Sequence, residues 1–158
     1  MAKRYKLTDL GEINHFLGLH ITRDRSKRRL SIDQRHYICT ILERFNLTSA
    51  RPTFTPLAAG TKLVANQGQD SDADLRKRYQ SIVGSLMYAM LGTRPDICFA
   101  VNRLSQFGAN PNQEHLVAAQ HVLRYLSQMC DFELIYNADN TEIHAYCDSH
   151  WASDPNSC

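Results

Sequence analysis

The sequence predicts an α+β fold in which an N-terminal β-hairpin precedes central helices and a C-terminal β-hairpin follows them. Three observations predict it. Apolar and polar residues alternate near both ends of the chain, as in strands with one buried face. Between the ends, apolar residues recur at three- and four-residue spacing, as in amphipathic helices. The 158 residues are 43% hydrophobic and 22% charged, which is typical of a globular protein.

The N-terminal hairpin is predicted over residues 10–34. Its first strand is formed by the apolar residues Phe16, Leu17, Leu19 and Ile21. The polar turn 24–29 follows, and Leu30 and Ile32 alternate with polar residues on the return strand. Gly18 stands inside the first strand, where a glycine indicates a bulge or the close approach of another backbone.

Residues 34–47 predict a helix, because apolar side chains fall on one face: Tyr37, Ile38, Ile41, Leu42 and Phe45. Cys39 lies within this pattern, as Cys98 does in a later helix, and both are expected to behave as small hydrophobic residues. Pro52 and Pro56 end the regular structure. Residues 58–74 are small, polar and acidic, so we expect an exposed linker at a sub-domain boundary.

Two helices are predicted in quick succession after this linker. The first ends at Gly92, and the second starts at Thr93 with Pro95 in its first turn. Their apolar positions are Tyr79, Ile82, Val83, Leu86, Met87 and Met90 in the first helix, and Ile97, Ala100, Val101 and Leu104 in the second.

The last helix is predicted over residues 110–128. Asn110 is the expected N-cap, Pro111 the first helical residue, and Gln113 the second member of a capping box. The tail then predicts a hairpin around the turn 138–140. Its strands carry Leu134 and Tyr136 on one side of the turn, and Ile143, Ala145 and Cys147 on the other.

Charge is distributed unevenly along the chain. The first 35 residues hold nine Lys or Arg and four Asp or Glu, whereas no Lys or Arg follows Met129 and six acidic residues do. This asymmetry favours phosphate contact near the start and divalent-metal contact near the end, although two solvated surfaces would give the same pattern.

Several kinds of site are not indicated. The chain has no phosphate-binding glycine loop, no dinucleotide pattern, no nucleophile elbow and no zinc-ligand spacing. Arg94 and Asp96 are expected to pair with each other or with the backbone. Five cysteines without a C-x-x-C pair favour a reducing intracellular compartment, and no apolar run approaches the roughly 20 residues of a membrane span.

The order of the motifs is diagnostic. D-L-G precedes F-L-G, and then come VGSLMYAMLGTRPDI, HLVAAQHVLRYL and AYCDSHWASD. In this order the sequence resembles the reverse transcriptases of copia-type LTR retrotransposons, from about Tyr5 to Asp154. The resemblance implies a partial reverse-transcriptase fold in five parts. They are the end of the palm with a primer-grip-like hairpin (1–33), a thumb-like helix (34–57), a linker (58–74), connecting helices (75–130) and the start of a ribonuclease H-like domain (131–158).

The resemblance also implies which residues contact nucleic acid. Phe16, Leu17, Gly18 and Leu19 fall where these polymerases place the primer grip, which holds the 3′ end of the growing strand. A glycine suits that position, because the backbone must approach a nucleic acid closely. The basic turn is expected to lie beside the grip and to bind phosphate through Arg23, Arg25, Lys27, Arg28 and Arg29.

Asp148 matches the first metal-binding carboxylate of ribonuclease H in this family. The Tyr-Asp-Asp motif of the polymerase is absent, and the chain contains no Asp-Asp pair. We therefore expect a non-catalytic piece of a polyprotein, without polymerase activity. We expect no cofactor in this piece, and Mg in the parent enzyme, with Asp148 as a weak, incomplete metal site.

The expected partner is a template–primer duplex of RNA or DNA, bound with the rest of the polyprotein. We expect no membrane partner, but we expect self-association through exposed strand edges. By family resemblance, the expected location is intracellular, in a cytoplasmic particle, the nucleus or both. Two alternatives stay open. One is a co-opted module that binds protein or RNA, and the other is a metal-dependent hydrolase built on Asp148, His150 and Asp154.

Overall fold

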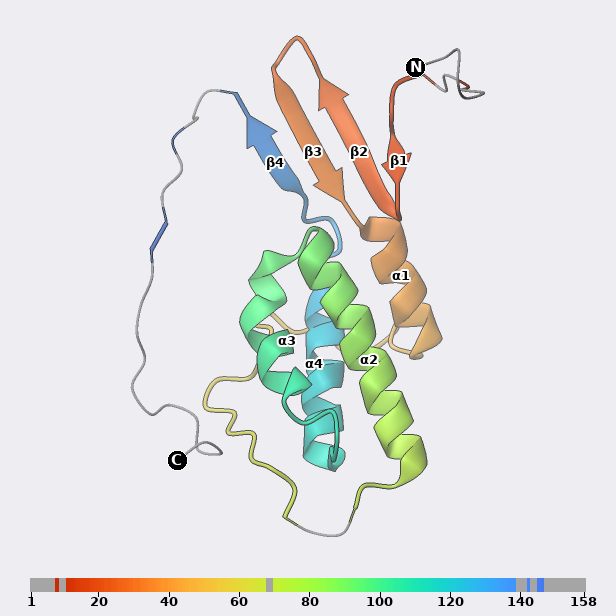
Figure 1. The fold of residues 1–158 in the computed structure, drawn as a ribbon, viewed down its shortest axis with the longest axis vertical. Coiled ribbons are helices and arrows are strands. Elements are labelled where there is room, and N and C mark those ends of the chain that lie inside the picture. The colour runs from red at the N-terminus through yellow and green to blue at the C-terminus, as the bar shows by residue number, and fades with distance from the viewer. Residues whose placement is uncertain (1–7, 9–10, 68–69, 139–141, 143–144, 147–158) are drawn as a thin grey trace, which may run out of the picture.

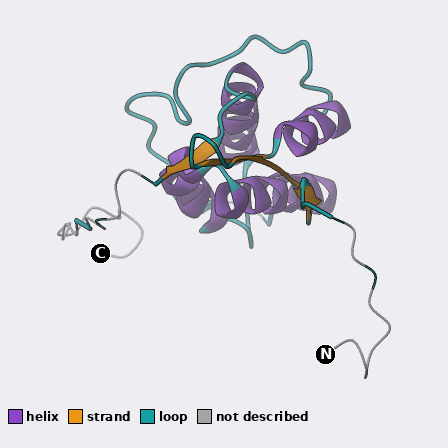
Figure 2. Ribbon diagram, turned by 90° about the horizontal axis from the view of Figure 1, so that it is seen from above, coloured by secondary structure: helices purple, strands orange, loops and turns teal. Residues whose placement is uncertain are grey.

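The structure is a computed structural model, and it describes residues 8, 11–67, 70–138, 142 and 145–146. Its sheet has four antiparallel strands in the order β1-β2-β3-β4. They are β1 (His15–Phe16), β2 (Leu19–Asp24), β3 (Arg29–Asp33) and β4 (Leu134–Asn137). Figure 1 shows the sheet extending beyond one end of the helices, and Figure 2 shows it nearly edge-on as a curved band. The predicted α+β class is confirmed.

The helices pack on one another to form the hydrophobic core. They are α1 (Arg35–Arg44), α2 (Ala73–Gly92), the short 3-10 helix η1 (Pro95–Ile97), α3 (Cys98–Ser105) and α4 (Gln113–Gln128). Their buried faces carry most of the residues that the helical spacing predicted, including Ile38, Leu86, Val101 and Leu123, whereas the predicted Met87 is exposed. Among the described residues, no helix has both the length and the apolar character that a membrane crossing needs.

The first predicted strand is divided by a tight turn. His15 pairs with His20 and Phe16 with Leu19, so only Leu17 and Gly18 connect β1 to β2. Both connecting residues have positive φ, 48° and 75°, as in the two-residue turns that suit the twist of a hairpin. Leu17 thus adopts a backbone conformation that is rare for a leucine, and the chain reverses direction there. The predicted hairpin is therefore a meander of three strands, β1, β2 and β3.

Of the predicted C-terminal hairpin, the structure shows the first strand, paired with β3. Leu134 pairs with Ile32 and Tyr136 with Leu30, so β4 completes the N-terminal sheet. Ala145 and Tyr146, in the second expected strand, have no regular structure, whereas Ile143 and Cys147 lie outside the described residues.

The expected start of the last helix is corrected by two residues. Asn112, not Asn110, is the N-cap of α4, and its side chain accepts a hydrogen bond from the backbone N–H of His115 at 3.0 Å. The His115 ring accepts one in return from the Asn112 N–H at 3.0 Å. Asn110 instead accepts a hydrogen bond from the Ser71 N–H at 2.7 Å, so its side chain fixes the approach to α2.

Thr93 also differs from its expected role. It follows the last residue of α2, and its hydroxyl donates to the buried Gln34 side chain at 3.0 Å. The next helical turn is η1, with Pro95 as its first residue. Cys39 and Cys98 are exposed, so the expectation that they behave as small hydrophobic residues within the apolar pattern is wrong. Each lies at the side of its helix, beside the buried stripe.

Arg94 and Asp96 pair, as predicted. The Arg94 guanidinium is fully buried and donates to the two Asp96 carboxylate oxygens at 3.0 and 2.7 Å, and to the Met129 carbonyl at 2.8 Å. Tyr125 also donates to Asp96, at 2.8 Å. Burial opposes ionisation of Asp96, but the bonds from Arg94 and Tyr125 prevail and hold its pKa below the usual value. This cluster, in which Arg94 is buried and Asp96 is partly exposed, joins the turn after α2 to the segment that leads into β4.

Candidate nucleic-acid interface

The predicted primer-grip residues form an exposed turn fixed to a helix. Leu17 and Phe16 are 73% and 54% exposed, and the Leu17 carbonyl accepts a hydrogen bond from the Tyr88 hydroxyl of α2. A Cβ added to Gly18 would lie 2.8 Å from that hydroxyl oxygen. The positive φ of Gly18 therefore favours glycine, and a larger residue there would also displace the Tyr88 hydroxyl. The close approach predicted at Gly18 is made by a side chain, not by a backbone.

Tyr88 also lies at one end of a groove between α1 and α2. The groove has a volume of about 510 Å³ and is lined by Tyr37, Arg44, Gln80, Ser81, Gly84, Ser85 and Tyr88. Gln80, Gly84 and Tyr88 are four residues apart in sequence, so they form one stripe along α2. A Cβ at Gly84 would meet nothing within 4 Å, so the stripe leaves open space at its centre.

Hydrogen bonds position the polar side chains of this groove. Tyr37 packs edge-on against Tyr88 with ring centroids 4.6 Å apart, and its hydroxyl donates to the Ser85 carbonyl at 3.0 Å. Burial raises the pKa of Tyr37, so the hydroxyl stays a neutral donor. Gln80 donates to the Gly108 carbonyl at 2.8 Å, and its side-chain oxygen is directed to no described partner. The apolar spacing of α2 indicates only its buried stripe and does not point to this groove. The signal that could have indicated it is the four-residue spacing of Gln80, Gly84 and Tyr88.

The five predicted phosphate-binding cations differ in whether they form ion pairs within the described part of the chain. Arg25 pairs with Glu12 at 3.0 Å, Lys27 with Asp24 at 3.7 Å, and Arg29 with Glu133 at 2.8 Å. A hydrogen bond from the Ser26 hydroxyl, followed by one from the Lys27 N–H, lowers the pKa of Asp24 and keeps it ionised. Arg23 and Arg28 make no ion pair within the described part of the chain.

The basic turn and the predicted grip lie at opposite ends of β2. The six residues of that strand span about 20 Å at roughly 3.3 Å per residue. The expectation that these two features are adjacent is therefore wrong. Figure 1 shows the β2–β3 turn at the far end of the sheet, whereas the β1–β2 turn lies beside the helices.

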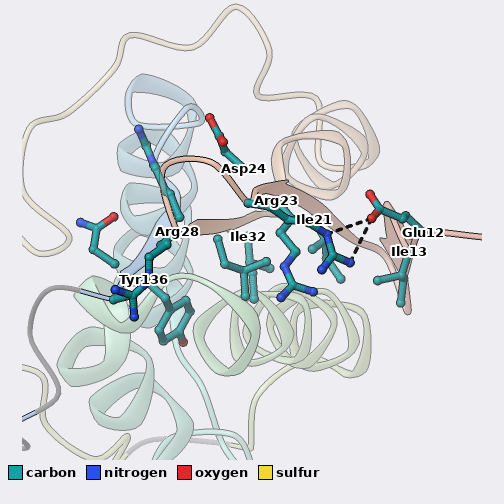
Figure 3. A pocket seen from close by; sticks show the side chains of 13 residues that line it. Glu12, Ile13, Ile21, Arg23, Asp24, Arg28, Ile32 and Tyr136 are labelled. Atoms are coloured by element: carbon teal, nitrogen blue, oxygen red, sulfur yellow. Dashed lines mark hydrogen bonds and ion pairs between the residues drawn. The ribbon is translucent and has the colours of Figure 1, made fainter.

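A second groove, of about 860 Å³, lies along one face of the sheet (Figure 3). Its apolar floor is formed by Ile13, Ile21, Leu30, Ile32 and Tyr136, and its polar lining includes Arg23, Arg25, Arg28 and Arg29. We call it the sheet groove.

The predicted metal site cannot be placed. Asp148, His150 and Asp154 lie outside the described residues. Within the described part of the chain, no three His, Cys, Asp or Glu side chains gather as ligands of a metal ion would. The described residues therefore provide no set of ligands for the Mg that the resemblance implied.

Comparison with known proteins identifies the family. A family model described as "Reverse transcriptase (RNA-dependent DNA polymerase)" matches residues 1–59. The chain is 39% identical over 158 residues to the "Retrovirus-related Pol polyprotein from transposon TNT 1-94" of Nicotiana tabacum, covering 98% of this chain and 12% of that protein. It is 40% identical to the corresponding polyprotein from transposon RE1 of Arabidopsis thaliana, covering 98% of this chain and 10% of that one. The chain belongs to the copia-type retrotransposon reverse transcriptases.

The match to these Pol polyproteins runs through the sheet, the helices and the tail. The family model covers β1, β2, β3 and α1, and the relatives extend the similarity over nearly the whole chain. The chain spans about a tenth of the length of these two relatives. An uncharacterised mitochondrial protein of Arabidopsis thaliana is 31% identical, over 96% of this chain and 61% of that protein. No solved structure matches this retrotransposon segment significantly.

Proposed function

We propose that this segment holds the sugar–phosphate backbone of a template–primer duplex for the reverse transcriptase of a retrotransposon Pol polyprotein. One observation carries the proposal. Tyr88 lines the groove between α1 and α2 and also hydrogen-bonds the exposed turn at Leu17 and Gly18. A helix face with an open glycine thus lies next to an exposed turn.

The chemistry of this surface suits a nucleic-acid backbone. Gly84 and Ser81 are small, so a backbone can approach α2 closely. The side-chain oxygens of Gln80 and Tyr37 can accept hydrogen bonds from a sugar hydroxyl, and Arg44 offers a charge to a phosphate. Contacts of this kind position a duplex without reading its sequence, as a polymerase requires.

The basic turn acts at longer range in this proposal. Arg25, Lys27 and Arg29 already face carboxylates, so each would exchange one anion for another on binding phosphate. We expect them, together with Arg23 and Arg28, to raise the association rate more than the final affinity. The chemical step itself would use residues of the longer polyprotein, so we expect no primer extension by this segment.

The test is binding of a labelled RNA–DNA hybrid, measured by fluorescence anisotropy at several salt concentrations. If Arg44 contacts a phosphate, Arg44→Gln lowers the salt slope by about 0.9 for that one contact. Arg51→Gln, at an exposed position outside the groove, is the matched control and leaves the slope unchanged. Equal slopes for Arg44→Gln and the unmodified chain would reject the groove as the duplex site.

The co-opted module stays a second candidate, because the mitochondrial relative shows that a similar segment occurs in a much shorter protein. Genomic context separates the two functions. An in-frame upstream sequence encoding the Tyr-Asp-Asp motif supports the polymerase. A promoter and transcript that begin at Met1 support the co-opted module.

A further inference from the structure

Three polar side chains that line the α1–α2 groove share one hydrogen-bonding pattern: each donates to a backbone carbonyl. The three side chains are Tyr37, Gln80 and Tyr88, and the carbonyls that accept are those of Ser85, Gly108 and Leu17, respectively. A tyrosine hydroxyl has a single proton to donate. Because both tyrosines have used that proton within the protein, their hydroxyl oxygens face the groove with lone pairs alone, which can only accept.

Gln80 adds a third acceptor. Only the nitrogen of its amide can donate to the Gly108 carbonyl, so that bond fixes the amide orientation and leaves the side-chain oxygen to accept. The neutral donors that remain in the lining are the second amide proton of Gln80 and the Ser81 hydroxyl, since the Ser85 hydroxyl donates to the Ser81 carbonyl at 2.9 Å. Acceptors thus dominate along the stripe from Gln80 to Tyr88.

Arg44 supplies the charge of the groove. It is exposed and makes no ion pair within the described part of the chain. Burial raises the pKa of Tyr37, and the bond to the Ser85 carbonyl and the nearby Arg44 charge offset only part of that rise, so Tyr37 stays neutral beside the cation. An occupant that satisfied the whole lining would carry an anion for Arg44 and hydroxyl donors for the acceptors.

We propose that the α1–α2 groove holds the RNA strand of the duplex and distinguishes it from a DNA strand through ribose 2′-hydroxyls. This inference rests on the proposed function and adds the strand and the group that is recognised. Both kinds of strand bring phosphates to Arg44. Within the strand, only the ribose backbone also carries a hydroxyl that can donate. A deoxyribose strand would displace water from the acceptors of Tyr37 and Gln80 without replacing its hydrogen bonds, which is unfavourable.

The length of the stripe suits more than one nucleotide. Gln80 and Tyr88 are eight residues apart, which is about 12 Å along a helix at 1.5 Å per residue. One nucleotide advances a strand by about 3.4 Å along the duplex axis. The acceptors at the two ends of the stripe can therefore contact the 2′-hydroxyls of different nucleotides, with the open space at Gly84 between them.

The experiment uses the full 158-residue chain and labelled duplexes of one sequence. They are an RNA–DNA hybrid, the same hybrid with 2′-fluoro in place of every 2′-hydroxyl, and a DNA–DNA duplex. Fluorine removes the donor but keeps the sugar pucker of RNA, so the comparison of the two hybrids isolates the hydroxyl. We expect fluorescence anisotropy to show the 2′-fluoro hybrid and the DNA duplex binding about fivefold to tenfold more weakly than the RNA–DNA hybrid, for the loss of one or two hydrogen bonds.

Two variants assign this preference to the groove. Tyr37→Phe and Gln80→Leu each remove one acceptor, so each should reduce the ratio of the two hybrid affinities by about threefold. Gln80 is exposed, so Gln80→Leu keeps the test valid if Tyr37→Phe does not fold, which circular dichroism reports. Tyr136→Phe, which removes a tyrosine hydroxyl in the sheet groove, is the matched control and should leave the ratio unchanged.

Arg44→Gln separates this inference from the proposed function. It should weaken both hybrids alike and leave their ratio unchanged, because both carry the same phosphates. Equal affinities for the two hybrids, with a lower salt slope for Arg44→Gln, would overturn ribose recognition and leave the duplex site in place. Equal affinities with an unchanged salt slope, or no binding of any duplex, would overturn both. A preference for the RNA–DNA hybrid that neither Tyr37→Phe nor Gln80→Leu reduces would also overturn the inference, since another surface would then recognise the ribose.

Discussion

Gly84→Leu should raise the stability of the fold and weaken the binding of a nucleic-acid duplex. Gly84 is exposed in the interior of α2, and a Cβ there would meet nothing within 4 Å. Leucine should therefore stabilise the fold by about 0.5–1 kcal/mol, since glycine is a poor helix residue. For a chain of this size the melting temperature should rise by about 1–4 °C.

The same leucine should weaken duplex binding. Its side chain would occupy the open centre of the 510 Å³ groove and hold a nucleic-acid backbone away from Gln80 and Arg44. Losing one or two such contacts costs about 1–3 kcal/mol, which is about 5- to 150-fold in the dissociation constant. Gly84→Ala should have an intermediate effect on binding and a similar effect on stability.

The assay pairs urea unfolding with anisotropy of a labelled RNA–DNA hybrid at one fixed salt concentration. Asn102→Leu, which places the same side chain on an exposed position of α3, should leave binding unchanged. If Gly84→Leu binds the hybrid as tightly as the unmodified chain does, the α1–α2 groove does not hold the duplex. A destabilised Gly84→Leu would show instead that the space beside this residue is filled.

Three further outcomes are expected. Tyr88→Phe should cost about 1 kcal/mol in urea unfolding and speed hydrogen exchange in the β1–β2 turn, because the bond to the Leu17 carbonyl is lost; unchanged exchange would contradict this. Arg94→Met should destabilise by about 1–3 kcal/mol, since it removes the main partner of the partly exposed Asp96 carboxylate and the bond to the Met129 carbonyl, and an unchanged free energy of unfolding would contradict this. Burial lowers the pKa of His115 below 6.5, so the unfolded chain takes up a proton first as the pH falls. The contribution of His115 to stability should therefore be constant above that pH. It should fall below it, by up to about 1.4 kcal/mol per pH unit, until the folded chain also binds the proton, and His115→Gln should reduce this slope in unfolding titrations.

Periodicity predicted the helices well, because each helix buries one stripe and exposes the other. The buried positions Ile38, Ile82 and Val122 follow directly from helical spacing. Capping was harder to predict. Asn110 and Asn112 flank Pro111, and both suit an N-cap. The choice between them depends on Ser71, whose N–H donates to the Asn110 side chain from 39 residues away in sequence. The sequence around Asn110 does not predict that contact.

The candidate interface was predictable only in part. Motif resemblance drew attention to Leu17 and Gly18, but a leucine with positive φ has no sequence signature, and Tyr88 reaches that turn from 71 residues away. The cations were also visible, whereas their carboxylate partners were not, because Glu133 meets Arg29 only through the pairing of β3 with β4. Long-range pairing thus decides which predicted side chains remain available.

The pairing of β3 with β4 has a consequence for how the chain folds. Arg29, in β3, and Glu133, directly before β4, form an ion pair and are 104 residues apart in sequence. Closing so long a loop is entropically costly until the intervening helices have condensed, so β2 and β3 should form early and β4 should dock late. During synthesis, the edge of β3 that later pairs with β4 would stay unpaired while about a hundred residues are added. A second nascent chain on the same messenger could offer its own strand to that edge, so slow translation through the helices would expose this protein to misassembly between neighbours.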